Sequence, residues 1–249
     1  VAVIYQEPRQ PAAGVLSRQA AEVPFGEAVR AVVLSDPQGR RFFALVVLSV
    51  LGTLAQDVLL EPYGALVLDM SVAQTTRLTA MWGAGTIIAM LASGSWLIQR
   101  TGYLAALRAG LALNVAVFAG FILAGWLGSP ALFRGLVFVL GLGTGLSMAG
   151  LLTAVIEYTT SARAGLMMGV WGTAAEIGQT MGGVLGGAVV DAMRWLTGGD
   201  ALIAYSTLFT LEGALLAIAL ALAADLRAKM PAHLADVSAG VPAGGMAGD

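Results

Sequence analysis

The chain has 249 residues, of which 58% are hydrophobic and only 11% are charged, and its net charge is −2. The low charge and the lack of a basic cluster exclude a nucleic-acid-binding protein. The absence of cysteine excludes disulfides and thiolate sites, and the single histidine, His233, excludes a multi-histidine metal or haem site.

Six long apolar stretches predict six membrane-spanning helices. A bilayer core about 30 Å thick needs about 20 apolar residues in a helix, and a helix satisfies its own backbone in lipid. In chain order the predicted spans are Phe42–Tyr63, Thr79–Ile98, Leu104–Leu127, Leu132–Ile156, Leu166–Trp195 and Leu202–Leu222. The first span is expected to end near Pro62, because proline interrupts a straight helix.

The fold class predicted is therefore an all-α, polytopic membrane protein. Residues 1–39 mix polar residues and proline and are predicted to form a cytoplasmic loop without a crossing. Residues 40–227 hold the six-transmembrane-helix bundle. Residues 228–249 are rich in alanine, glycine and proline and are predicted to be a disordered cytoplasmic tail.

The distribution of basic residues predicts the orientation. With six spans, ten of the thirteen Lys and Arg residues fall on the side of the N-terminal loop and the tail. The other side holds only Arg77, Arg134 and Arg194. Because cytoplasmic loops are enriched in Lys and Arg, both termini are predicted to be cytoplasmic.

Glycines are concentrated in the fourth and fifth spans, where several repeat at four-residue spacing, as at Gly178, Gly182 and Gly186. Such spacing lets helix backbones approach closely in lipid. It is also compatible with a flexible helix that rocks beside a central cavity, as in secondary transporters. The sequence leaves both interpretations open.

Acidic residues at membrane depth are the main functional signal. Glu176 and Glu212 lie near the middle of the fifth and sixth spans, and Gln179 follows Glu176 by three residues. Asp57 and Glu61 are four residues apart and share one face of the first span. An ionised side chain at mid-membrane costs at least about 2.5 kcal/mol. Glu176 and Glu212 are therefore expected to be protonated, paired or directed into a polar cavity that binds a ligand.

The loop between the second and third spans reads Gln99-Arg100-Thr101-Gly102-Tyr103. It resembles the cytoplasmic loop motif of the major facilitator superfamily, Gly-x-x-x-Asp-Arg-x-Gly-Arg-Arg, with Arg100 and Gly102 as the matching positions. In that superfamily the motif follows the second helix of each six-helix half. The resemblance implies the C-terminal six-helix half of a major facilitator fold, whose partner is a missing N-terminal six-helix half.

Longer phrases resemble a more specific family, the PucC/LhaA family. They are residues 56–64, QDVLLEPYG, residues 76–83, TRLTAMWG, and residues 164–175, AGLMMGVWGTAA. The resemblance implies a membrane assembly factor for bacterial light-harvesting antenna complexes that binds or delivers (bacterio)chlorophyll. It further implies antenna subunits as partners and a location in the bacterial inner membrane, in its intracytoplasmic, photosynthetic part.

A pigment site of that kind needs one axial ligand for magnesium and flat apolar walls. Because no histidine lies in a span, the candidate ligands for pigment or protons are Glu176, Glu212, Gln179, Asp57 and Glu61. The magnesium of a bound pigment would be held through Glu176 or Glu212, and no other metal is expected. Trp82, Trp171 and Phe209 are candidate walls, although plain packing explains each of them as well.

A proton-coupled major facilitator transporter of a small solute is the alternative, with Glu176 and Glu212 as proton sites. An enzyme is not expected, because the sequence offers no nucleophile–base pair, metal cluster or phosphate-binding loop.

Overall fold

The structure is a computed structural model that describes residues 37–54, 59–157 and 164–225. Every element in these ranges is a helix, which confirms the predicted all-α class. The elements are α3 (Pro37–Leu54), α4 (Leu60–Val67), α5 (Val72–Ala92), the π-helix η3 (Ser93–Leu97), α6 (Ile98–Thr101), α7 (Tyr103–Trp126), α8 (Pro130–Glu157), α9 (Ala164–Leu196) and α10 (Ala201–Asp225).

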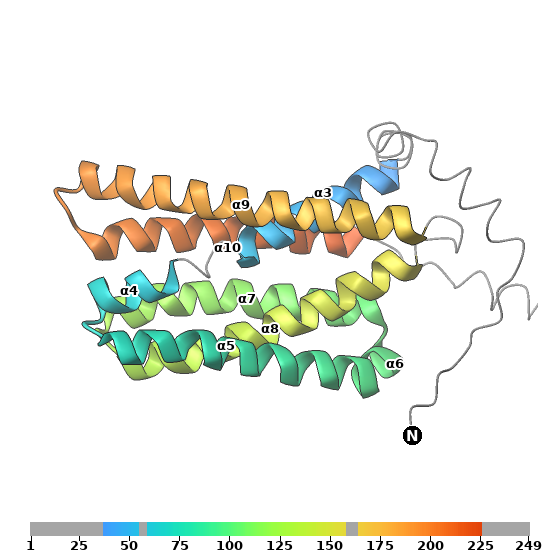
Figure 1. Ribbon diagram of the computed structural model, residues 1–249, viewed down its shortest axis with the longest axis horizontal. Coiled ribbons are helices and arrows are strands. Elements are labelled where there is room, and N and C mark those ends of the chain that lie inside the picture. The colour runs from blue at the N-terminus through green and yellow to red at the C-terminus, as the bar shows by residue number, and fades with distance from the viewer. Residues whose placement is uncertain (1–36, 55–58, 158–163, 226–249) are drawn as a thin grey trace, which may run out of the picture.

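The long helices form two layers (Figure 1). One layer contains α3, α9 and α10, and the other contains α5, α7 and α8. Packing of α10 against α7 joins the two layers. Arg77, Arg134 and Arg194 belong to helix ends that lie on the same side of the bundle, the left side of Figure 1.

Four of the described helical segments are long and apolar enough to cross a membrane: Val72–Thr101, Tyr103–Trp126, Pro130–Glu157 and Ala201–Asp225. The other two predicted spans differ from these. In the first, the described apolar helix Phe43–Thr53 is short. In the fifth, α9 has 33 residues, but Glu176, Gln179 and many glycines lower its hydropathy.

The predicted boundaries of the third to sixth spans lie within a few residues of α7 to α10. The second helix begins at Val72, earlier than predicted, where the Gln74 Oε1 atom accepts a hydrogen bond from the Ser71 backbone N–H at 3.0 Å. The predicted end of the first span at Pro62 is wrong. Pro62 lies in the first turn of α4, where a helix needs no backbone N–H donor.

Glycines of α7 and α8 bring the backbones of three helices together. A Cβ atom added to Gly141 of α8 would lie 2.9 Å from the carbonyl carbon of Trp82 in α5. One added to Gly150 would lie 2.7 Å from the Tyr103 carbonyl oxygen, and one added to Gly110 would lie 2.9 Å from the Ser147 Cα atom. For these glycines the structure supports the close-packing interpretation.

This contact leads to a first prediction. We expect Gly141→Ala to lower the free energy of unfolding by about 1–3 kcal/mol, because the added methyl group forces α5 away from α8. Thermal unfolding of the detergent-solubilised protein measures the change. Gly135→Ala in the same helix is the matched control, since a Cβ there would meet nothing within 4 Å. Equal melting temperatures for the two variants would contradict the packing argument.

Candidate functional site

Polar side chains lie at the middle of the long helices. Glu212 in α10, Asn114 in α7, Thr144 in α8 and Gln179 in α9 are each within about one helical turn of the midpoint of their helix. In a bilayer this depth is the most apolar, so each of these groups needs a polar partner or a role. The candidate site is built from them.

Glu212 is buried inside the bundle, with only 3% of its surface exposed. Gly52 of α3 packs beside it, and a Cβ added to Gly52 would lie 3.5 Å from the Glu212 carbonyl oxygen and 2.8 Å from the Leu216 side chain. Neither carboxylate oxygen has a hydrogen-bond partner among the described residues. Because an unpaired buried charge is costly, this environment suits a neutral acid or one that meets a ligand.

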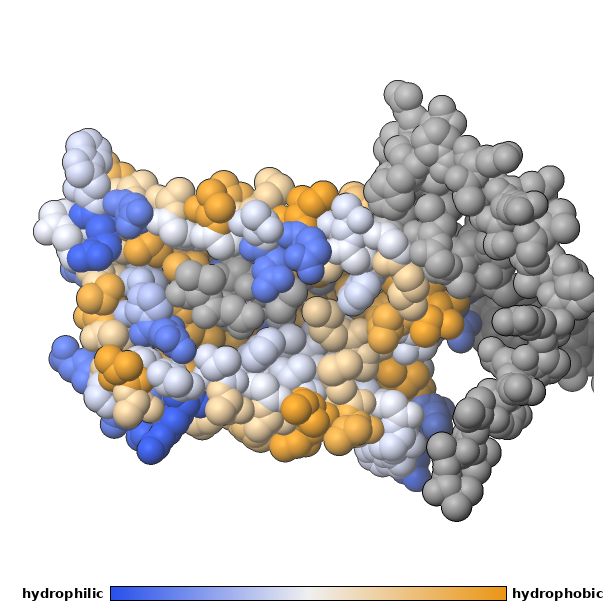
Figure 2. Space-filling model, viewed as in Figure 1, coloured by the Kyte–Doolittle hydropathy of each residue, from blue (hydrophilic) through white to orange (hydrophobic). Residues whose placement is uncertain are grey.

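Glu176 and Gln179 lie on a different side of the fold. Both are exposed on α9, whereas Gly178 between them is buried against Val50 of α3. Figure 2 shows a hydrophilic patch partway along this helix. The structure therefore does not bring Glu176 to the buried Glu212, and a ligand role for either residue stays a prediction.

Three glycines lie on the same face of α9 as these two residues. Gly172 precedes Glu176 by four residues, and Gly183 and Gly187 follow Gln179 at four-residue spacing, so the five residues share one helical face. A Cβ added to any of these three glycines would meet nothing within 4 Å. These glycines of α9 therefore leave open space beside polar groups at mid-depth. The glycines of α8 at Gly141 and Gly150 instead face the backbone of a neighbouring helix.

The predicted pair Asp57 and Glu61 is only half described, because Asp57 lies outside the described residues. Glu61 is half-buried in the first turn of α4. Its Oε1 atom accepts a hydrogen bond of 3.3 Å from the hydroxyl of Thr79 in α5. In the described part of the chain, Glu61 thus connects α4 to α5.

The three predicted apolar walls differ in exposure. Phe209 is buried, and its ring centroid lies 4.9 Å from that of Tyr63 and 5.3 Å from that of Phe121. The Tyr63 hydroxyl donates a 2.8 Å hydrogen bond to the Phe121 carbonyl oxygen, which fixes this aromatic cluster. Trp82 and Trp171 are only half-buried, so part of each ring is open.

The loop-motif residues lie at the junction between α6 and α7. The guanidinium carbon of Arg100 lies 4.6 Å from the ring centroid of Trp96, a cation–π contact. Gly102 has a φ of +83°, which favours glycine and allows the turn between the two helices. Nearby, Arg108 donates hydrogen bonds to the carbonyl oxygens of Ala223 (2.9 Å) and Ala224 (3.1 Å), at the C-terminus of α10.

Sequence reasoning missed Asn114, which is fully buried and has no hydrogen-bond partner for its amide in the described part of the chain. It packs against Gly143 of α8, where an added Cβ would lie 2.8 Å from the Asn114 Cγ atom. The signal that could have found it is an uncharged polar residue at the middle of the predicted span Leu104–Leu127.

Long apolar helices with polar groups at mid-depth define a multi-pass α-helical membrane protein. The family model described as "PUCC protein" matches residues 1–230. The chain therefore belongs to the PucC family.

Individual relatives agree with this assignment. Protein PucC of Rhodovulum sulfidophilum is 35% identical over 64% of this chain and 35% of its own length. Protein PucC of Cereibacter sphaeroides is 32% identical over 87% of this chain and 47% of its own length. A protein of Rhodobacter capsulatus named "Bacteriochlorophyll synthase 44.5 kDa chain" is 28% identical over 65% of this chain and 39% of its own length. The chain thus spans less than half the length of these relatives.

The isolation of Glu212 leads to a second prediction. Glu212→Leu is expected to keep or raise the free energy of unfolding, because it removes a desolvation penalty of about 1–3 kcal/mol and no hydrogen bond among the described residues. Thermal unfolding in detergent measures the change. Leu216→Ala, one turn further along the buried face of α10, is the positive control and should cost about 2–5 kcal/mol. A similar loss for Glu212→Leu would mean that the acid has a structural partner.

Proposed function

We propose that this protein is a non-enzymatic membrane assembly factor for bacterial light-harvesting antenna complexes, which binds or delivers (bacterio)chlorophyll. Membership of the PucC family supports the proposal. So does the name of one relative, which refers to bacteriochlorophyll. The structural observation that carries the proposal is the polar, open face of α9 at mid-depth.

The exposed face of α9 fits a flat ligand better than the interior does. The core around Glu212 is filled by packed side chains, and the hollow between α3 and α8 is only water-sized. On α9, by contrast, Gly172, Gly183 and Gly187 leave open space where a ring plane could approach the backbone. We therefore place the pigment outside α9 and not inside the bundle.

Glu176 and Gln179 would hold the pigment on that face. A carboxylate or amide oxygen is a suitable ligand for magnesium, which prefers oxygen. Both side chains are exposed at mid-depth, where facing lipid tails would be costly for Glu176. When bound, the pigment would supply the Lewis-acidic magnesium and the light-absorbing ring, and the chain's own residues would bind and orient it.

The partners in this account are antenna subunits and the further sequence present in the relatives. Because the relatives are more than twice as long as the part matched here, we propose that this chain works as a six-helix half of a major facilitator fold. The second half would cover the remaining open faces. The protein would lie in the inner, intracytoplasmic membrane. The side of the bundle that is richer in Lys and Arg would face the cytoplasm.

Pigment binding is tested by purifying the intact protein from a pigmented host and recording its absorption spectrum per mole of protein. We expect the double variant Glu176→Leu/Gln179→Leu to lose bound pigment about tenfold, equivalent to about 1.4 kcal/mol, and to lower antenna content in membranes. Asp191→Asn, an exposed acid near the end of α9, is the matched control and should leave both unchanged. Equal pigment in wild type and double variant would remove α9 as the site.

A proton-coupled transporter of a small solute is the second candidate, and the buried Glu212 favours it. A protonated carboxyl group without a hydrogen-bond partner among the described residues can release its proton and bind one again during transport. In vesicles with the intact protein, uptake should follow an imposed pH gradient and be abolished by Glu212→Gln. The same change should leave the melting temperature and pigment content unaltered. Uptake that ignores both gradient and substitution would reject this candidate.

A further inference from the structure

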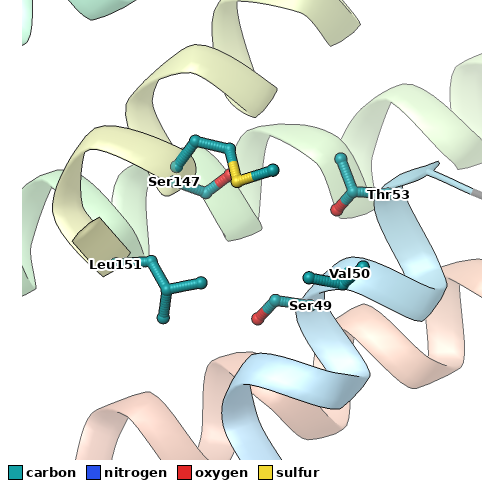
Figure 3. Close-up of a pocket in the computed structure, with 6 residues that line it drawn as sticks. Ser49, Val50, Thr53, Ser147 and Leu151 are labelled. Atoms are coloured by element: carbon teal, nitrogen blue, oxygen red, sulfur yellow. The ribbon is translucent and has the colours of Figure 1, made fainter. Parts of the chain in front are cut away.

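A hollow separates α3 and α8 at the point where the two layers of the bundle face each other (Figure 3). Its described lining comes from three residues of each helix: Ser49, Val50 and Thr53 of α3, and Ser147, Met148 and Leu151 of α8. Three of the six carry hydroxyl groups, and all three are buried, with at most 5% of their surface exposed. Hydroxyl-bearing residues from both facing helices therefore line one small space.

The hydroxyl of Ser49 is the group that needs an occupant. It is buried and has no hydrogen-bond partner among the described residues. Ser147 uses its hydroxyl hydrogen on the Thr144 carbonyl oxygen at 3.0 Å, so it presents only lone pairs to the hollow. The lining thus offers a donor from Ser49, a further hydroxyl from Thr53 and an acceptor from Ser147.

Size and charge limit what can enter. The volume of the hollow is about the minimum that one internal water molecule needs. No charged side chain is among the described lining residues. An ion there would be buried without a counter-charge, which is far more costly than a neutral hydrogen-bonding group.

We propose that the hollow between α3 and α8 binds one neutral oxygen atom that accepts a hydrogen bond from Ser49 and bridges to α8. The oxygen belongs to a water molecule or to the carbonyl or hydroxyl group of a larger ligand that reaches between the layers. The bridge links the layers through α3 and α8, in addition to the direct packing of α10 on α7. This site does not depend on the proposed pigment function.

Stability separates an occupied hollow from an empty one. If the oxygen is bound, Ser49→Ala breaks a hydrogen bond and should lower the melting temperature of the intact protein by about 2–4 °C. Ser93→Ala is the matched control. Its buried hydroxyl also lacks a partner among the described residues, but it does not line this hollow, so its loss should leave the melting temperature unchanged or higher. Ser49→Ala behaving like Ser93→Ala would overturn the proposal.

A high-resolution density map of the intact, detergent-purified protein identifies the source of the oxygen. An isolated peak within 3.5 Å of the Ser49 hydroxyl, as roughly expected for a hydrogen bond, would assign a water molecule. Density that continues into a larger molecule would assign a ligand oxygen, and its removal by delipidation should then empty the hollow. A map with no density there would overturn the proposal.

Discussion

The arrangement of the layer formed by α5, α7 and α8 depends on the close approach of α8 to the other two helices. In lipid, apolar side chains gain little by leaving one apolar environment for another, so helices associate through van der Waals packing and hydrogen bonds. Gly141 and Gly145 let α8 touch the backbone of α5, and Gly143 and Gly150 let it touch α7. The Thr86 hydroxyl then reaches the Gly141 carbonyl oxygen at 3.2 Å, a bond between α5 and α8 that larger residues would prevent.

Some glycines of α9 serve a different purpose, because a Cβ added to them would meet nothing within 4 Å. The side chains of Val50 and Leu59 occupy the space beside the buried Gly178 and Gly186, as in ordinary helix packing. Gly172, Gly183 and Gly187 are half-buried, but they leave open space where a side chain would lie, beside the exposed Glu176 and Gln179. A surface of this kind is poorly suited to lipid tails. It is therefore the part of the molecule where we expect a ligand or partner helix.

The sequence predicted the helical class, the family and the positions of α7 to α10 closely, because a run of apolar residues is a local signal. It also predicted the depth of Glu176 and Glu212 along their helices. It could not predict their direction. Glu212 lies in α10, which is apolar on all sides, so no amphipathic pattern indicated that this acid points inward. Glu176 shares a polar face of α9 with Gln179, but that pattern alone does not say whether the face meets another helix or stays exposed.

Long-range contacts were also beyond local patterns. The cluster of Tyr63, Phe121, Phe133 and Phe209 brings together four helices, and none of the four rings has a distinctive neighbourhood in the sequence. Arg108 of α7 donates hydrogen bonds to carbonyl oxygens near the C-terminus of α10, the first of them 115 residues away in the sequence. The predicted end of the first span at Pro62 was wrong because the effect of a proline depends on its place within a helix. In the first turn of a helix, where Pro62 lies, a proline is tolerated.

The most direct test of the account is a cryo-electron-microscopy structure of the intact protein purified from pigmented membranes. The account predicts a macrocycle lying against the outer face of α9, with its magnesium coordinated by an oxygen of Glu176 or Gln179. A map in which lipid tails cover that face, while pigment is bound elsewhere or is absent, would contradict it.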